Sequence, residues 1–342
     1  MALDPYGLGR VVGEPGVLPQ RARRLDPGLP LREDELLLDV ERLNVDAASF
    51  RQLREACGDD PVQIGLEIGR LVRERGKLHN PVTGSGGMLL GVVREVGPRH
   101  PAHGKLAPGD RVASLVSLTL TPLALEEIRA VNLAADRVEV RGHAILFASG
   151  LWVRLPGDLP EALVLATLDV CGAPALVARH VRPGDRVLVI GAGKSGALAC
   201  AQARRSGARQ ILACDISPAA CGRLEAQGYA EGLALDATRA LDVHAAVSKA
   251  TGGELCDLVV NVASVGGTEL ATLLSVRDGG TALFFSMATS FTAAALGAEG
   301  IGKDATLLIG NGYAVGHAEL ALDLVRKEPP LRRLLEERFG GL

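Results

Sequence analysis

Hydrophobic residues are spaced differently in the two halves of the chain. Before residue 150 the apolar runs are short and are separated by Gly and Pro, at 35–43, 88–96, 111–118 and 144–147. Such runs between turn residues predict β-strands. Residues 51–77 depart from this pattern, because their apolar and charged positions recur at helical spacing. The first half is therefore predicted to be mostly β with one helical stretch.

From about residue 160, strand-like runs alternate with helix-length segments. The strand candidates are 186–190, 210–214, 255–262 and 281–285, and the helical stretches between them include 195–206 and 218–227. Alternating strands and helices predict a parallel sheet covered on both faces, and right-handed crossovers make it doubly wound. Two short helices separated by Pro329-Pro330 are predicted over 316–339.

Length and composition narrow the possibilities. A chain of 342 residues exceeds what one core usually organises, so two domains are expected. Only 3% of residues are aromatic and the net charge is −3, which disfavours nucleic acid as a partner. The longest apolar stretch, 162–178, is interrupted by Asp169, Gly172 and Pro174, so no membrane partner is expected.

The cysteines and the N-terminus indicate a cytoplasmic protein. Six cysteines lie at positions 57, 171, 200, 214, 221 and 256, and no pair has the C-x-x-C spacing of a zinc site or a redox dithiol. Most are expected to be small buried residues in a reducing compartment. Residues 1–16 lack a basic region followed by an apolar run, so no signal peptide is predicted.

A glycine-rich loop carries the clearest chemical signal. The run Gly191-Ala192-Gly193-Lys194-Ser195-Gly196 lies between the strand candidate 187–190 and a helical stretch at 197–203. Glycines at these positions allow a tight turn, a close backbone approach to a pyrophosphate and close packing of helix on strand. The helix N-terminus adds free N–H groups for the phosphates. The loop therefore predicts a Rossmann dinucleotide site.

Asp215 indicates which dinucleotide binds. It ends the next strand, 19 residues after Gly196, where an acidic residue accepts from the ribose 2′-hydroxyl and repels a 2′-phosphate. NAD is therefore favoured over NADP. The predicted cofactor residues are Gly191, Gly193, Lys194, Ser195, Gly196, Asp215, Asn261, Val262 and Ser286.

Two other interpretations of the loop exist. A glycine-rich turn can occur in an α/β protein that binds no dinucleotide. A P-loop would also contain Gly-Lys-Ser, but its first glycine would have to fall on Leu188, so that alternative fails.

The order of a β-rich domain followed by a Rossmann domain resembles the medium-chain dehydrogenase/reductase superfamily. The segments that carry this resemblance are 36–46, 88–116, 142–156 and 166–196. They include Leu-Gly-Val-Val-Arg-Glu-Val-Gly at 90–97 and Pro-Gly-Asp-Arg-Val at 108–112. The resemblance implies an α/β chain with a GroES-like catalytic domain at 1–165 and 306–342 and a doubly wound Rossmann domain at 166–305.

The same resemblance implies that the catalytic zinc of the alcohol-dehydrogenase branch is missing. Asn44 stands where the first ligand Cys would fall, and Gly84-Ser85-Gly86-Gly87 replaces the Gly-His-Glu segment. Only Cys171 matches a ligand position, and one thiol does not hold a zinc site. A zinc-free enzyme is predicted.

Further segments resemble the family of 3,5-diaminohexanoate dehydrogenases, which act in bacterial lysine fermentation. These segments are 43–50, 80–89, 284–291, 297–300, 311–313 and 316–319. The resemblance implies NAD-dependent oxidative deamination of L-erythro-3,5-diaminohexanoate to 5-amino-3-oxohexanoate, with release of ammonium.

Such a reaction needs a carboxylate more than a metal. An amine substrate is a cation and passes through an iminium, which a nearby metal cation would oppose. A carboxylate stabilises the cation, accepts its proton and activates the hydrolytic water. The predicted catalytic residues are Asp46, Asp169 and Glu299.

Each carboxylate also has a structural interpretation. Asp46 falls where zinc-dependent relatives place the Ser or Thr of their proton relay, and it is also suited to cap a helix that starts near Ala47. Asp169 lies in an apolar segment, where it needs either a partner or a task. Glu299 lies in a Gly-rich segment and is either a ligand for the substrate ammonium or a solvated loop residue.

The substrate carboxylate calls for a cation, and Arg51, Lys77 and Lys303 are the candidates. Each of them has the alternative interpretation of a surface charge. Ser286 and Thr289 follow the carboxyl end of a predicted sheet strand, where ligands of doubly wound folds gather, so they are predicted to contact nicotinamide or substrate.

Two other functions remain open at the level of the sequence. One is a zinc-free quinone or enone reductase, although such enzymes commonly take NADPH and Asp215 argues against that cofactor. The other is a nucleotide-binding protein without catalysis. A homodimer or homotetramer is expected, because zinc-free relatives commonly pair through the Rossmann sheet.

Overall fold

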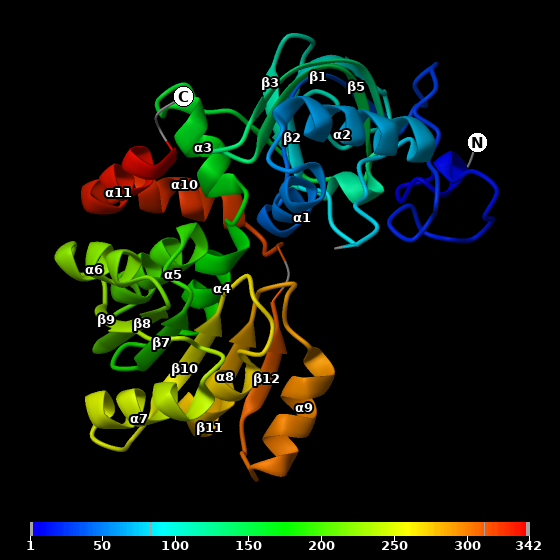
Figure 1. Cartoon of the computed structure of the whole chain (residues 1–342). Coiled ribbons are helices and arrows are strands. Elements are labelled where there is room, and N and C mark those ends of the chain that lie inside the picture. The colour runs from blue at the N-terminus through cyan, green and yellow to red at the C-terminus, as the bar shows by residue number, and fades with distance from the viewer. Residues whose placement is uncertain (1–2, 83, 311, 340–342) are drawn as a thin grey trace. The chain divides into compact units, whose positions relative to one another are not determined.

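The computed structural model describes residues 3–82, 84–310 and 312–339, so Thr83 and Asn311 of the resemblance segments lie outside it. Contacts divide the chain into unit 1, Met1–Asp158, and unit 2, Leu159–Leu342 (Figure 1). This division differs from the predicted one, 1–165 with 306–342 against 166–305. Residues 306–342 group with unit 2, because Thr306–Ile309 joins the parallel sheet and the helices after it pack on helices of the same unit.

Unit 1 contains an antiparallel sheet of six strands in the order β4-β5-β1-β2-β3-β6. The strands are β1 (Glu35–Asn44), β2 (Met88–Val96), β3 (Arg111–Ser114), β4 (Leu123–Asn132), β5 (Arg137–Phe147) and β6 (Trp152–Arg154). Four of them match the predicted runs. β4 was not predicted, because its outward side chains are polar and only its first residue is buried.

Two helices, α1 (Ala47–Cys57) and α2 (Pro61–Arg75), occupy the stretch predicted as helical. Asp46 caps α1 and Asp60 caps α2, while Gly58 and Gly76 end them in the left-handed conformation. Their apolar faces pack with β1 in one core, which includes Leu36, Leu38, Phe50, Ile64 and Ile68. Short 3-10 turns lie at Leu8–Arg10 and Leu118–Leu120.

Buried polar contacts join residues 10–20 to the rest of unit 1. Arg10 is 2% exposed, and its Nε and Nη2 donate to the carboxylate of Glu35 at 2.8 and 2.6 Å. Lys77, fully buried, donates from Nζ to the carbonyls of Pro19 and Gln20 at 2.7 and 3.0 Å. Both cations are therefore satisfied within the fold, as buried charges must be.

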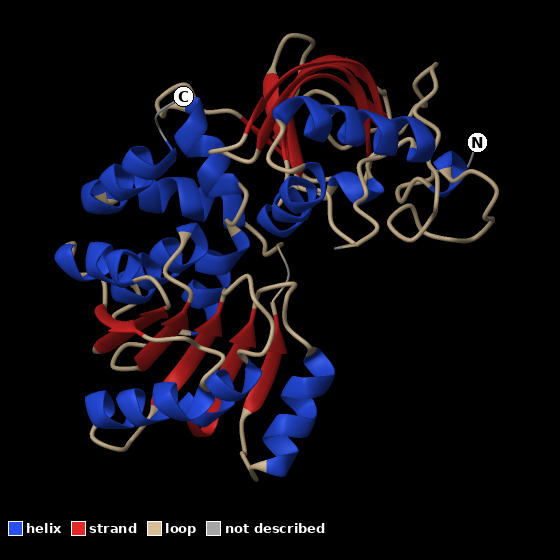
Figure 2. Ribbon diagram, in the orientation of Figure 1, coloured by secondary structure: helices blue, strands red, loops and turns tan. Residues whose placement is uncertain are grey.

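Unit 2 contains a parallel sheet of six strands in the order β12-β11-β10-β7-β8-β9 (Figure 2). The strands are β7 (Arg186–Ile190), β8 (Gln210–Asp215), β9 (Glu231–Ala234), β10 (Cys256–Asn261), β11 (Val276–Phe284) and β12 (Thr306–Ile309). The central strands are nearly continuous buried runs, as expected for a sheet covered on both faces. This confirms the predicted α/β class.

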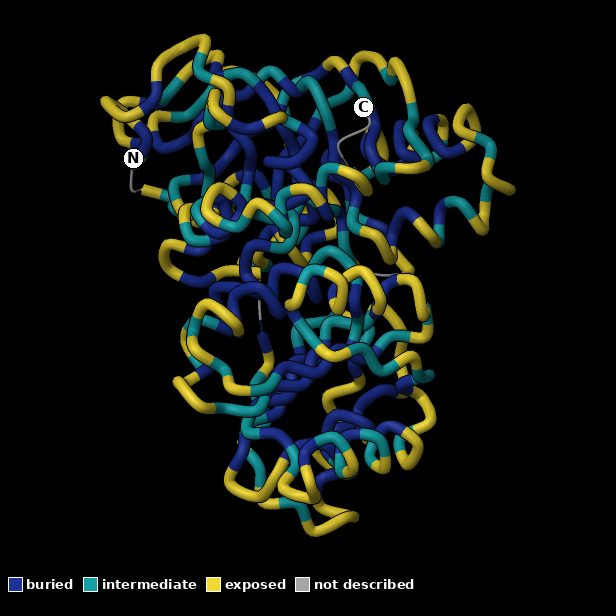
Figure 3. Tube along the Cα trace, turned by 90° about the vertical axis from the view of Figure 1, so that its left-hand side faces the viewer, coloured by how far each residue is buried: buried dark blue, intermediate teal, exposed yellow. Residues whose placement is uncertain are grey.

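Helices cover both faces of the parallel sheet (Figure 2). They are α3 (Glu161–Leu168), α4 (Gly172–His180), α5 (Lys194–Arg205), α6 (Pro218–Ala226), α7 (Ala240–Thr251), α8 (Glu269–Ser275), α9 (Phe291–Gly300), α10 (His317–Lys327) and α11 (Pro329–Phe339). The predicted pair of helices at the end of the chain, broken at the two prolines, is confirmed by α10 and α11. Buried residues follow the strands and the inward helix faces of each unit (Figure 3).

In the part of the chain that the structure describes, no single helix is long and apolar enough to cross a membrane. The helices α3 and α4 reach that length and composition only as a pair bent by 55°. All of α3 except Glu161 is buried, as are six residues of α4, so the pair has the burial of core helices.

Candidate functional site

The glycine-rich loop connects β7 to α5 at the carboxyl end of the parallel sheet. Gly191 has φ +104°, a value that side chains rarely adopt. A Cβ on Gly196 would lie 1.8 Å from the Gly191 carbonyl oxygen, so helix and strand approach closely only because this residue is Gly. A Cβ on Gly193 would meet nothing within 4 Å. Gly191 and Gly196 therefore have the turn and packing roles predicted for them, and the approach of a pyrophosphate to Gly193 stays a prediction.

The loop fits the pyrophosphate of a dinucleotide. Gly193 is the N-cap of α5 and makes no side-chain cap, and the first N–H groups of a helix have no partner within it. The open space over Gly193 leaves room for a phosphate beside those donors. A nicotinamide dinucleotide held there would supply a hydride acceptor.

Asp215 ends β8 next to this loop. Its Oδ2 accepts from the Ala192 N–H at 2.8 Å, and its Oδ1 accepts from the Ser217 N–H at 2.9 Å. The carboxylate therefore lies against the backbone of the glycine loop, at the position where it would meet an adenosine ribose.

Asn261 and Val262 support the loop from the end of β10. The Asn261 side chain is fully buried, and its Nδ2 donates to the hydroxyls of Thr268 and Thr272 at 2.8 and 2.9 Å. The Val262 N–H donates to the Ile190 carbonyl at 2.9 Å. Asn261 is thus a positioning residue, since its amide is occupied by protein groups.

Lys194 and Asp169 meet in unit 2. Lys194 is the first residue of α5, and its Nζ lies 2.5 Å from Oδ2 of Asp169, the residue that ends α3. Both side chains are largely buried, at 21% and 15% exposure. Asp169 was predicted to need either a partner or a task, and the structure shows that Lys194 is a partner.

Cys171 follows two residues later and is 2% exposed. Burial is the main reason that its pKa rises to about 12, and the nearby carboxylates of Asp169 and Glu319 add to the effect. The thiol is therefore protonated at neutral pH and lacks the thiolate character of a nucleophile.

The backbone around Asn44 excludes a side chain at position 87. A Cβ on Gly87, which has φ +94°, would lie 2.1 Å from the Asn44 carbonyl oxygen and 2.8 Å from the Asp46 nitrogen. Among the described residues, no three His, Cys, Asp or Glu side chains are grouped to hold a metal ion.

Asp46 has one oxygen occupied and one unpaired. Its Oδ1 accepts from the Ser49 N–H at 3.0 Å, which confirms the predicted helix cap. Its Oδ2 is buried and has no hydrogen-bond partner within the described residues. Leaving a buried carboxylate oxygen unpaired is costly, so this atom is suited to a cationic ligand.

The three cation candidates lie in different surroundings. Arg51, one and a half turns into α1, lines a polar hollow of about 490 Å³ with Arg54, Glu55 and Asp136. Lys77 is occupied by the two carbonyls described above, and burial lowers its pKa to about 8. The structure therefore corrects the prediction for Lys77, which holds the N-terminal segment.

Glu299 and Lys303 lie at the wrong edge of the sheet for the predicted roles. They precede β12, at the amino end of the parallel strands, whereas the glycine loop lies at the carboxyl end. Lys303 is 3.7 Å from Asp278, near the start of β11, and Glu299 is exposed. Within unit 2 the structure separates both residues from the cofactor loop, and the solvated alternative for Glu299 is favoured.

Ser286 and Thr289 lie at the same edge as the glycine loop. They form a turn after β11, in which the Thr289 N–H donates to the Ser286 carbonyl at 3.2 Å. The Ser286 hydroxyl accepts from the Ala288 N–H at 3.1 Å. Their predicted place at a carboxyl end is confirmed, and their contact with a ligand stays a prediction.

Two histidines without a predicted role have a buried ring nitrogen that lacks a partner within the described residues. They are His79, at Nδ1, and His317, at Nε2. Burial lowers the pKa of both rings, so they are neutral at pH 7. His317 begins α10 and makes an edge contact with Tyr313 at 5.2 Å. The spacing of metal ligands along a sequence does not reveal isolated rings of this kind.

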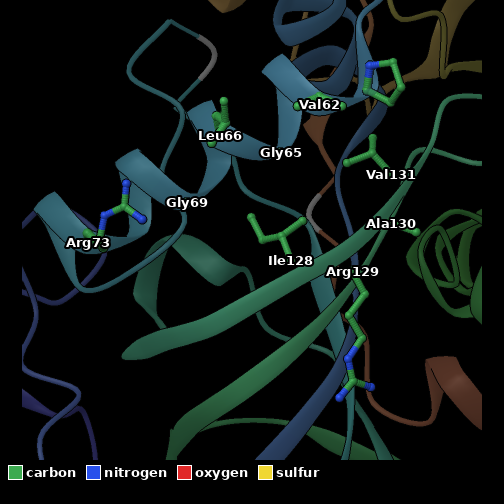
Figure 4. A pocket seen from close by; sticks show the side chains of 10 residues that line it. Val62, Gly65, Leu66, Gly69, Arg73, Ile128, Arg129, Ala130 and Val131 are labelled. Atoms are coloured by element: carbon green, nitrogen blue, oxygen red, sulfur yellow. The ribbon is translucent and has the colours of Figure 1, made fainter.

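A separate groove of about 520 Å³ lies between α2 and β4 (Figure 4). Its floor is apolar, because Gly65 and Gly69 let Ile128 and Val131 approach the helix. None of the predicted site residues lines this groove.

Together these features define the class of protein. An antiparallel GroES-like unit followed by a Rossmann unit with an intact glycine loop is the fold of the medium-chain dehydrogenases/reductases, a class of enzymes that use a nicotinamide cofactor. Two solved structures with this fold are similar to the chain. An alcohol dehydrogenase from Thermotoga maritima aligns over 90% of this chain and 88% of its own, with a TM-score of 0.56 and 16% identity. A quinone oxidoreductase from Pseudomonas syringae aligns over 91% and 83%, with a TM-score of 0.55 and 18% identity.

The sequence identifies the family within that class. Residues 9–156 match the family model for the L-erythro-3,5-diaminohexanoate dehydrogenase N-terminal domain. The enzyme of that name from Acetoanaerobium sticklandii is 43% identical over 98% of both chains, and the one from Fusobacterium nucleatum is 44% identical over 98% of both. The chain belongs to the L-erythro-3,5-diaminohexanoate dehydrogenase family.

Two glycine substitutions separate cofactor binding from folding. We expect Gly193→Ala to leave the thermal unfolding midpoint unchanged, since its Cβ meets open space and its φ of −77° suits any residue. The same Cβ occupies the space of the pyrophosphate, so the dissociation constant of NADH should rise at least about tenfold, or 1.4 kcal/mol. Fluorescence titration measures the constant.

Gly196→Ala is the matched comparison. Its Cβ collides with the Gly191 carbonyl, so we expect a lower unfolding midpoint together with weaker binding. Unchanged NADH affinity in Gly193→Ala would show that the loop does not hold the pyrophosphate.

Proposed function

We propose that the chain is a cytoplasmic dehydrogenase that converts L-erythro-3,5-diaminohexanoate, NAD and water to 5-amino-3-oxohexanoate, NADH, ammonium and a proton. The main support for this proposal is the 43–44% identity, over 98% of the chain, to enzymes named for this substrate. In the balanced reaction the C3–H leaves as hydride, the ammonium group loses one proton, and water replaces nitrogen on the resulting iminium. All six cysteines are free, which suits a reducing compartment.

Asp46 is the proposed base. Its Oδ1 is committed to the cap of α1, which fixes the direction of the side chain, and its Oδ2 is buried and unpaired. A substrate ammonium would satisfy that oxygen, and the proton would pass to it as hydride leaves C3. The negative charge also stabilises the iminium that follows, a task for which a metal cation would be unsuited.

The first experiment mixes the purified, chelator-treated protein with L-erythro-3,5-diaminohexanoate and NAD. We expect NADH, followed at 340 nm, and ammonium to appear in equal amounts at a rate that chelator does not change. No turnover of this diamino acid, combined with NADPH-dependent reduction of an enone, would replace the proposed function with that of a reductase.

Asp46→Asn tests the role of the carboxylate in the same assay. Asn caps helices as well as Asp, so the unfolding midpoint should not change, whereas kcat should fall at least about a hundredfold with the loss of the base. Asp46→Ala provides the control for the cap, with an additional stability loss of about 1 kcal/mol. Full activity of Asp46→Asn would exclude Asp46 as the base and leave Asp169 as the remaining candidate.

The proposal of NAD as the specific cofactor rests on Asp215. Its carboxylate lies on the glycine loop backbone, where it would accept from a 2′-hydroxyl and repel a 2′-phosphate. We expect Asp215→Ser to shift the ratio of kcat/KM values for NAD and NADP toward NADP by at least about tenfold, or 1.4 kcal/mol. Asp242→Ser removes the same charge from an exposed position on α7 and should leave the ratio unchanged. An unchanged ratio in Asp215→Ser would contradict this role.

We also propose that the protein is a homodimer or homotetramer. β12 is an edge strand of only four residues. Exposed apolar side chains occur in it and in the segments before and after it, namely Met287, Leu296, Ile309 and Val315 at 67, 62, 65 and 84% exposure. An open edge and exposed apolar side chains both favour pairing with another copy.

Light scattering after size exclusion measures the assembly. Ile309→Lys should reduce the mass of the assembly, whereas Leu241→Lys, at a position 73% exposed on α7, should not. A wild-type protein that runs as a monomer would contradict the proposal.

A further inference from the structure

Lys194 belongs to the loop expected to bind phosphates, yet its ammonium pairs with a carboxylate of the protein. It is the fourth residue of the glycine loop and the first residue of α5, yet its ammonium lies on Asp169, 25 residues earlier in the chain, at 2.5 Å. The pair therefore joins the cofactor loop to the corner between α3 and α4.

Two anions compete for this one ammonium when a dinucleotide binds. The pyrophosphate would lie at the start of α5, over the open space at Gly193, one residue before Lys194. A lysine on the first helical residue is adjacent in the chain to the N–H groups that would hold such a phosphate, and an ammonium is a suitable partner for a phosphate. The Asp169 carboxylate holds the same ammonium in the structure, with both side chains shielded from solvent.

We propose that Lys194 exchanges partners, leaving Asp169 for the pyrophosphate when the dinucleotide binds. Both pairings are charge-assisted hydrogen bonds between a lysine ammonium and an anion, so the exchange replaces one strong contact with another of the same kind. In the binary complex the Asp169 carboxylate no longer contacts Lys194.

The exchange would change the charge around Asp169 once the dinucleotide is bound. This consequence rests on the proposed deamination of a diamino acid, because a substrate with two ammonium groups requires anionic partners.

The test uses ADP-ribose, which carries the pyrophosphate but no nicotinamide, and adenosine, which lacks phosphates. Isothermal titration gives both dissociation constants for the wild type, Asp169→Asn, Lys194→Met and the double variant, at fixed salt. We expect Asp169→Asn to tighten ADP-ribose binding about tenfold by freeing Lys194, and Lys194→Met to weaken it about tenfold. Adenosine binding should not change. In the Lys194→Met background, Asp169→Asn should tighten binding by much less.

Equal tightening by Asp169→Asn with and without Lys194 would overturn the proposal, because it would reflect repulsion by Asp169 alone. No tightening would overturn it as well. A crystal structure of the wild type with ADP-ribose decides directly and does not depend on how the variants fold. Lys194 Nζ on a phosphate oxygen supports the exchange, and an intact pair with Asp169 refutes it. No amino-acid substrate enters these experiments, so their outcome is separate from that of the proposed function.

Discussion

The close approach of α5 to the end of β7 is the contact on which the cofactor site of unit 2 depends. Gly196 lies so near the Gly191 carbonyl that a methyl group would be 1.8 Å from that oxygen. This approach starts the helix directly at the carboxyl edge of the sheet, with its free N–H groups over the open space at Gly193. It also fixes the place of Lys194 on the first turn, from which the side chain reaches Asp169. Asp215 fastens the neighbouring strand to the same loop through the Ala192 N–H.

In unit 1 a second close approach, between Gly87 and the backbone of Asn44, shapes the surroundings of Asp46. Gly87 passes the Asn44 carbonyl with no room for a side chain, and its φ of +94° is adopted by few other residues. The backbone therefore admits no side chain at position 87. The polar group left at this place is Asp46, whose capped and unpaired oxygens give a carboxylate of fixed direction.

Sequence patterns predicted the parts of the fold in which one physical requirement dominates. Strands buried on both faces, such as β7 and β10, show as continuous apolar runs, and the glycines at 191, 193 and 196 show as a fixed spacing. β4 escaped detection because an edge strand with Glu and Arg on its surface carries little apolar signal. β12 was assigned to the other domain, since four half-exposed residues reveal neither a sheet nor a partner.

The candidate site was predictable to a smaller extent. Residue type identified Asp46 and Asp215, but it did not show that Lys77 would be consumed by the carbonyls of Pro19 and Gln20. For Glu299 and Lys303 the type of residue was suitable and the location was not, because side chains between a helix and the following strand lie at the amino edge of a parallel sheet. The pair between Lys194 and Asp169 is a contact across 25 residues that no local pattern encodes.

The anchoring of residues 7–20 has a consequence for synthesis on the ribosome. Arg10 pairs with Glu35, the carbonyls of Pro19 and Gln20 accept from Lys77, and Gly7 lies against the ring of Phe147 in β5. Because the ribosome makes these partners later than the segment itself, Gly7 meets Phe147 only after the 140 residues that follow it have been made. Residues 7–20 are therefore among the last parts of unit 1 to acquire their final contacts.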